Sequence, residues 1–216
     1  MTLQQSTQAG LNALLGASLT IDGILGAESD QAVASLKSKL SEIFTVKGYA
    51  PSAIIGVRMS DEYTNQFSDW GILNINGTIR LFPMSTKPGS SYQKNDTYVS
   101  KTGGCACLVP GKYKGMWSYR SAGGWSGDAY LMQVNPCAIY RDKSEGTTID
   151  KSVTETGLFG INFHSWKGDN SQSVDNLSAG CQVEQESVLL EIIDSLNISG
   201  NIDYTLLEYS DFNQSA

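Results

Sequence analysis

The sequence predicts a mainly β domain, a β-sandwich or barrel with a few helices, preceded by a small helical domain at the N-terminus. Three observations predict this fold. Apolar residues recur at helical period through residues 3–44. Short apolar and β-branched runs, separated by turn residues, fill most of the remaining chain. The 22 glycines, against 5 prolines, indicate many turns between short strands.

Two apolar stripes predict two N-terminal helices, and a loop with two glycines at residues 21–26 separates them. We expect Ser29 to cap the second helix. A linker follows at residues 47–52, so the predicted domains are residues 1–46 and 53–216. The stripes consist of Leu11, Leu14, Leu15 and Leu19 and of Ala32, Val33, Leu36, Leu40 and Ile43.

The pattern after the linker is that of strands. Residues 53–59 are apolar and β-branched, and a hairpin is predicted where residues 70–75 and 78–82 flank Asn76-Gly77, a dipeptide typical of two-residue turns. Further strands are expected at residues 107–109, 130–134, 138–140 and 157–163 and around Cys181, followed by a helix over residues 187–196.

The charge of the chain excludes some partners. The net charge is −7 and the sequence pI is about 4.7, which argues against a nucleic-acid partner, because such a partner requires a basic surface. No apolar run is long enough to insert into a membrane. The first 36 residues contain neither Lys nor Arg, so we expect synthesis in the host cytoplasm without a signal peptide.

Four cysteines leave more than one possibility. Cys105 and Cys107 are separated by one residue, closer than in usual zinc sites, so no metal site is predicted. A disulfide among Cys105, Cys107 and Cys137 would require an oxidising compartment. Buried free thiols are the favoured alternative.

The chemistry is expected around the single histidine. His164 precedes Cys181 by 17 positions, and small residues lie beside both. Imidazole titrates in the range needed to accept a thiol proton. His164 and Cys181 are therefore the candidate base and nucleophile. A surface or packed histidine and a buried cysteine are the structural alternative.

The surrounding residues resemble the catalytic domain of the L,D-transpeptidases, over about residues 53–196. The family places a histidine before a Ser/Thr-His-Gly-Cys motif, and this chain has His164 before Ser178-Ala179-Gly180-Cys181. Three further segments agree in kind and order: residues 81–89, 108–113 and 160–164. The pattern resembles compact phage-encoded proteins with this domain more than the bacterial cross-linking enzymes.

The resemblance implies roles for individual residues. His164 would be the base, Cys181 the nucleophile that forms a thioester, and Gly180 part of the oxyanion-binding backbone. Ser165 would orient the base through its carbonyl, and Ser178 would support the site. The predicted substrate-binding residues are Trp166, Ser85 and Thr86. No cofactor or metal is expected.

Two residues depart from the family pattern. Ala179 stands where a second histidine is usual, and Gln182 follows the cysteine where Arg or Asn is common. Ala179 favours an alternative in which the fold serves as a wall-binding or structural component with little turnover.

The N-terminal segment resembles the small three-helix peptidoglycan-binding domain of cell-wall enzymes. The residues that carry this likeness are Ile21, Asp22, Gly23, Ile24, Leu25, Gly26, Ala32 and Val33. Ala27 replaces a common proline, and Leu36-Lys37 replaces an aromatic-Gln pair. A plain helical hairpin packed on the main domain is the alternative.

Together these resemblances predict a cysteine enzyme acting on bacterial peptidoglycan. We expect a phage-encoded wall-degrading peptidase, a free lysis enzyme or one carried on a virion with other virion proteins as partners. Two alternatives stay open. One is a non-catalytic component of a phage or contractile particle, and the other is a bacterial L,D-transpeptidase that cross-links peptidoglycan.

Overall fold

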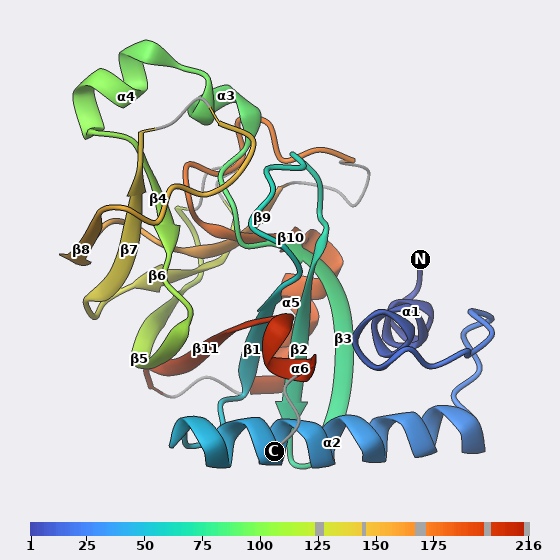
Figure 1. Ribbon diagram of the computed structural model, residues 1–216. Coiled ribbons are helices and arrows are strands. Elements are labelled where there is room, and N and C mark those ends of the chain that lie inside the picture. The colour runs from blue at the N-terminus through green and yellow to red at the C-terminus, as the bar shows by residue number, and fades with distance from the viewer. Residues whose placement is uncertain (124–127, 144–145, 167–171, 197–199, 214–216) are drawn as a thin grey trace.

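The computed structural model describes residues 1–123, 128–143, 146–166, 172–196 and 200–213. A closed β-barrel stands at the centre, a three-stranded sheet lies beside it, and helices cover its outside (Figure 1). The prediction of a mainly β fold with a few helices is confirmed. The helices are α1 (Leu3–Leu15), α2 (Ala27–Lys47), α3 (Ser90–Gln93), α4 (Asp96–Thr102), α5 (Glu186–Leu196) and α6 (Ser210–Asn213).

Eight strands close the barrel in the order β1-β11-β5-β6-β9-β10-β3-β2, and the smaller sheet has the order β4-β7-β8. Most neighbours are antiparallel, but β1 pairs with β11 and β9 pairs with β10 in parallel. The strands are β1 (Ile54–Arg58), β2 (Asp69–Ile75), β3 (Thr78–Ser85), β4 (Cys105–Leu108), β5 (Gly111–Arg120), β6 (Tyr130–Gln133), β7 (Cys137–Asp142), β8 (Thr154–Gly157), β9 (Phe163–Trp166), β10 (Gln182–Gln185) and β11 (Ile202–Glu208).

Large aromatic side chains fill the barrel. Trp117 is fully buried, and its ring centroid lies 4.5 Å from that of Tyr204 and 5.1 Å from that of Phe163. The Trp117 indole N–H donates to the Ile161 carbonyl at 2.8 Å, so its one polar group is satisfied in the core. This packing fixes β5, β9 and β11 relative to one another.

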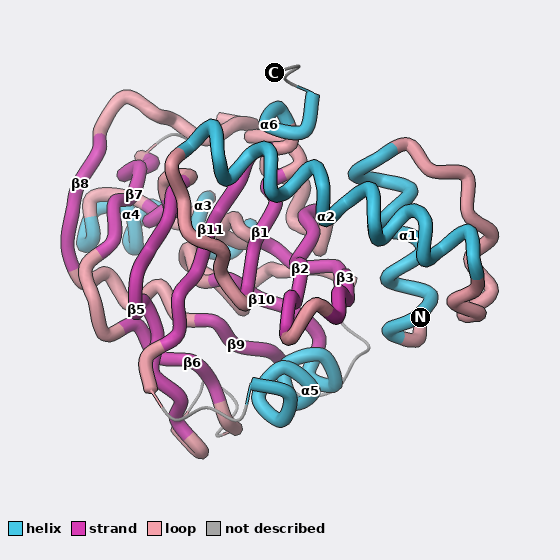
Figure 2. The backbone as a smooth tube through the Cα atoms, turned by 90° about the horizontal axis from the view of Figure 1, so that it is seen from below, coloured by secondary structure: helices cyan, strands magenta, loops and turns pink. Residues whose placement is uncertain are grey.

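The two N-terminal helices cover the outside of the barrel. Figure 1 shows α1 beside β3 and α2 running across the lower end of the strands, and Figure 2 shows the same arrangement from below. Leu11 of α1 and Leu36 of α2 belong to one apolar cluster with Ile72 and Leu81 of the barrel wall. Burial against the barrel, together with each helix's own apolar stripe, accounts for both helices.

The start of α2 differs from the prediction. Gly26 is its N-cap, without a side-chain cap hydrogen bond, and Ser29 lies inside the first turn. The expectation that Ser29 caps the helix is wrong, because the helix begins before that residue. The α1 helix instead begins with a capping box, in which Thr2 and Gln5 bond each other's backbone N–H groups.

The predicted hairpin is confirmed. β2 and β3 pair across Asn76-Gly77, and both residues have positive φ, 50° and 81°. This is the conformation of a two-residue turn that matches the twist of the flanking strands. The expected strand over residues 157–163 is wrong: β8 ends at Gly157 and β9 begins at Phe163. Between them the chain forms a loop with Gly160 at φ 73°.

Several elements were not predicted. The strands β5 and β11 are two of them. Polar residues and Gly115, at φ 58°, interrupt the apolar pattern of β5. β11 follows a helix and a stretch that includes residues outside the described part.

Among the described residues, no helix has both the length and the apolar character to cross a membrane. Cys105, Cys107 and Cys137 are buried free thiols in this structure.

Candidate active site

Parallel pairing of β9 with β10 brings the candidate nucleophile and base together. His164 is the register partner of Val183, and Cys181 lies two residues before Val183. Side chains alternate between the two faces of a strand. Phe163 and Gln182 point into the barrel, so His164 and Val183 share the outer face, and Cys181, directly before β10, packs against the apolar cluster that contains Val183. The structure thus places His164 within β9 and Cys181 directly before the paired strand β10.

The His164 ring is held in a defined tautomer. Its side chain is buried, and Nδ1 lies 3.3 Å from the Ser165 carbonyl oxygen. Because a carbonyl only accepts hydrogen bonds, Nδ1 carries the hydrogen and Nε2 is left as the acceptor. Burial lowers the pKa of His164 below its usual value, although the Ser165 bond opposes this. The ring is therefore neutral near pH 7, in the form that can accept a proton.

The Cys181 thiol is half-buried and donates to the Gly160 carbonyl oxygen at 3.3 Å. Burial raises the pKa of this thiol to about 11, while the backbone N–H groups of Asn162 and Cys181 oppose the shift. Both His164 and Cys181 lie in the described part of the chain, and no hydrogen bond joins their side chains there. The resting state near pH 7 therefore has a protonated Cys181 thiol and a neutral His164 imidazole.

A tight turn at residues 178–181 positions Cys181, the candidate nucleophile. Ser178 is buried, and its Oγ accepts from the Gly180 N–H at 2.9 Å and donates to the Cys181 carbonyl at 2.9 Å. The Ser178 carbonyl accepts from Gly89 N–H at 2.8 Å, and the Ala179 carbonyl from Ala106 N–H at 3.2 Å. Ser178 thus acts as a support of the turn. The Gly180 amide, expected to face an oxyanion, is already bonded to Ser178.

Ser85 and Thr86 lie in a buried network instead of on an open surface. Ser85 donates to the Lys87 carbonyl at 3.0 Å. The Thr86 hydroxyl donates to Asp69 at 2.8 Å and accepts from Arg58 Nε at 3.0 Å. Both residues are almost fully buried, so the structure gives them internal partners. Trp166 ends β9, but its side chain lies outside the described part of the structure.

The buried hydrogen-bond network that holds Thr86 was not predicted from the sequence. Asp69 at the start of β2 accepts from the N–H groups of Met59 and Thr86 and pairs with Lys87 Nζ at 3.2 Å. Arg58 of β1 donates to the Thr86 and Leu108 carbonyls at 3.1 and 2.9 Å. The network joins the ends of β1, β2, β3 and β4. Its charged residues are distant from one another in the chain, so no local pattern reveals them.

No protein-family model matches the chain, and no curated protein sequence shows significant similarity to it. Among solved structures, the chain is similar to an L,D-transpeptidase from Xylanimonas cellulosilytica. The two are 12% identical, the match covers 93% of this chain and 92% of that one, and the TM-score is 0.37. A likeness at this level assigns no role to any residue.

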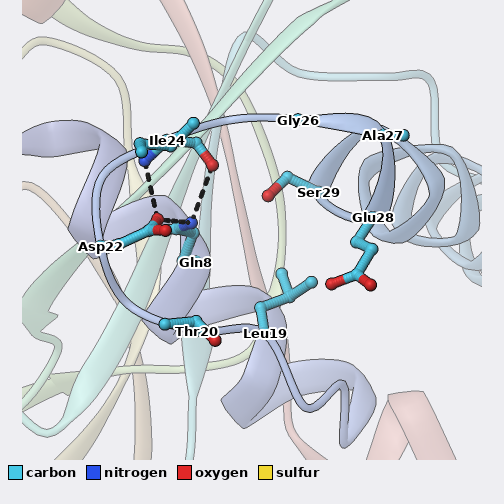
Figure 3. A pocket seen from close by; sticks show the side chains of 9 residues that line it. All are labelled: Gln8, Leu19, Thr20, Asp22, Ile24, Gly26, Ala27, Glu28 and Ser29. Carbon is cyan, nitrogen blue, oxygen red and sulfur yellow. Dashed lines mark hydrogen bonds between the residues drawn. The ribbon is translucent and has the colours of Figure 1, made fainter.

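A second polar site lies at the N-terminal helices, in a pocket of about 290 Å³ between the 19–26 loop and the start of α2 (Figure 3). Gln8 of α1 shapes this loop, since its side chain donates to Asp22 at 2.9 Å and to the Ile24 carbonyl at 3.1 Å and accepts from Gly23 N–H at 2.8 Å. Ser29 is buried and makes no side-chain hydrogen bond within the described part of the chain, and Figure 3 shows its hydroxyl directed into the pocket.

Proposed function

We propose that this protein is a peptidoglycan-acting cysteine enzyme that attacks a carbonyl group of a stem peptide through Cys181. The observation that carries the proposal is the parallel register of β9 and β10, which pairs His164 with Val183, two residues after Cys181. The tautomer fixed by Ser165 adds support, because it leaves Nε2 as a proton acceptor. The sequence pattern around these residues supplies the substrate class.

The reaction begins from the resting pair. The thiol turns from the Gly160 carbonyl towards His164, and its proton passes from Sγ to Nε2. The thiolate attacks the carbonyl carbon, the C–N bond breaks, and the leaving amine takes the proton from His164. A thioester on Cys181 remains. Water then resolves it with release of a carboxylate, or a second amine resolves it to form a new peptide bond.

Within this proposal, the sequence pattern favours hydrolysis by a phage-encoded wall-degrading enzyme. Such an enzyme would be made in the host cytoplasm and would act on the wall after lysis or from a particle. Cross-linking by a bacterial enzyme is the alternative. The two differ in their products, because hydrolysis creates new stem-peptide carboxylates and transpeptidation creates new cross-linked species.

The test is mass spectrometry of muropeptides after purified sacculi have been incubated with the protein. We expect new stem-peptide fragments that disappear with Cys181→Ala and with His164→Gln. Cys105→Ala is the matched cysteine control, since Cys105 is a buried free thiol and we expect it to keep activity. Fragments that persist in Cys181→Ala would refute the cysteine mechanism.

The pocket in Figure 3 favours a second function, binding of wall glycan by the N-terminal helices. It offers the Ser29 hydroxyl as a donor or acceptor, the Asp22 and Glu28 carboxylates as acceptors, and an apolar surface at Leu19 and Ile24. The carboxylates disfavour an anionic ligand and suit the hydroxyl groups of a neutral sugar. Ile24 is 71% exposed, as a surface for a sugar ring requires.

Sedimentation with sacculi tests this second function separately from turnover. The inactive Cys181→Ala protein is compared with the same protein carrying Ser29→Val or Ile24→Ser. We expect both added changes to reduce the bound fraction severalfold. Leu190→Ser is the matched control, because Leu190 is 54% exposed on α5, away from this pocket. Equal binding by all four proteins would contradict a role for the pocket.

A further inference from the structure

The Gln133 side chain holds the loop between β8 and β9 in place through hydrogen bonds. This residue ends β6 and is 7% exposed. Its Oε1 accepts from the N–H groups of Phe159 at 3.1 Å and Ile161 at 2.8 Å. Its Nε2 donates to the Gly157 carbonyl at 3.2 Å and to the Asn135 carbonyl at 3.0 Å. One buried amide therefore satisfies backbone groups at both ends and in the middle of the loop.

The backbone of Gln133 contributes as well. Its N–H donates to Asn162 Oδ1 at 2.9 Å, at the point where the loop enters β9. Residues 158–162 are not in a strand, so these contacts take the place of a regular ladder. Deleting the Gln133 amide would leave the buried Ile161 N–H and three partly buried backbone groups without this partner, and the loop would lose its fixed path.

The loop carries the group that contacts the nucleophile. Gly160 lies between Phe159 and Ile161, whose N–H groups donate to Gln133. The Gly160 carbonyl accepts a hydrogen bond from the Cys181 thiol at 3.3 Å. A carbonyl beside a thiol favours the protonated form, because it accepts the S–H hydrogen and would face a thiolate with a lone pair. The position of this carbonyl therefore sets how readily the thiol is released towards His164.

We propose that Gln133 is a positioning residue for Cys181, which holds the Gly160 carbonyl so that the thiol is kept protonated and turned away from His164 until substrate enters. This rests on the proposed function only in taking Cys181 as the nucleophile. The hydrogen bond from Cys181 to Gly160 keeps the thiol in its resting position. The loop must move, and this bond must break, before the proton can reach Nε2.

The titration of the Cys181 thiol tests this proposal without any substrate. The protein is labelled with ¹³Cβ-cysteine, and the NMR shift of each cysteine is followed from about pH 8 to about pH 12. In Gln133→Met we expect the Cys181 midpoint to fall by roughly half a unit to one unit, the effect of losing one hydrogen bond to the neutral form. Gln133→Asn, which keeps an amide but cannot reach the loop, is expected to act in the same direction and provides a second variant if Gln133→Met does not fold.

Asn12→Leu is the matched control. The Asn12 amide also fastens a loop, through bonds of 2.9 and 2.8 Å to Leu19, but in the N-terminal segment. A purely structural role for Gln133 predicts that both changes lower the melting temperature while the Cys181 midpoint stays at its wild-type value, and that result would overturn the proposal. A shifted midpoint in a protein that leaves sacculi unchanged would support the positioning role and count against the proposed function alone.

Discussion

Gly180 and Ala106 approach each other so closely that no side chain fits between them. A Cβ at position 180 would lie 1.9 Å from the Ala106 carbonyl oxygen, and Gly180 has φ 142°. Ala106 lies on β4 of the smaller sheet, whereas Gly180 lies in the turn before Cys181 and β10. The contact therefore packs this turn against the smaller sheet directly beside Cys181 and explains the glycine without any role in catalysis.

Gly180→Ala is expected to disrupt the turn, because the added methyl group must displace backbone and adopt a φ that L-residues avoid. We expect loss of wall-degrading activity and a melting temperature lower by several degrees, measured by circular dichroism. Gly200→Ala is the control, since a Cβ there meets no atom within 4 Å. Wild-type stability in Gly180→Ala would show that the turn can relax.

Glu184 is expected to weaken the fold as the pH rises. It is buried on β10, its carboxylate oxygens have no hydrogen-bond partner among the described residues, and burial raises its pKa well above the usual value. Above about pH 4.5 the unfolded state ionises while the folded state keeps its proton, so the free energy of unfolding falls with rising pH, by up to about 1.4 kcal/mol per pH unit.

Glu184→Gln removes this pH-dependent loss. We expect the variant to gain stability relative to the wild type in urea unfolding at about pH 8, and the gain to shrink towards about pH 4. The exposed Glu191→Gln on α5 controls for the loss of one charge. A gain that is the same at both pH values would mean that Glu184 is not a buried neutral acid.

His164 is expected to have the opposite pH effect. Burial lowers its pKa in the folded state, so below about pH 6.5 the unfolded state binds a proton that the folded state does not. The unfolded state is then favoured, and stability falls as the pH drops through this range. We expect the loss between about pH 7 and about pH 5 to be smaller in His164→Gln. Equal losses in the two proteins would contradict a buried neutral imidazole.

The elements that were predicted correctly are those that depend on residues close together in the sequence. The Asn76-Gly77 hairpin and both N-terminal helices depend on turn chemistry and apolar spacing within a few residues, and they are confirmed. The sequence also singled out His164, which lies on β9, and Cys181, which directly precedes the paired strand β10. It did not predict the Gly160 acceptor or the break in the 157–163 strand, because the amide that shapes this loop comes from Gln133 on another strand.

The network around Asp69 is expected to stabilise the barrel ends strongly. Asp69 is fully buried and accepts from Thr86 Oγ1 at 2.8 Å, while Lys87 Nζ lies 3.2 Å away. Asp69→Asn removes the charge but leaves Lys87 and Arg58 buried. Breaking a buried pair from one side costs about 3–5 kcal/mol, so we expect a loss of that order in urea unfolding.

Lys87→Met removes the positive charge from the same network but keeps a long side chain that can pack there. Combined with Asp69→Asn, it removes the cation that the first change leaves without its carboxylate. The double variant is therefore expected to lose less stability than the sum of the two single variants. The Arg141–Glu155 pair, in which the Glu155 side chain is 41% exposed, supplies the comparison. Glu155→Gln should cost much less than Asp69→Asn, because solvent screens an exposed pair. Strict additivity of Asp69→Asn and Lys87→Met would show that the two side chains act independently.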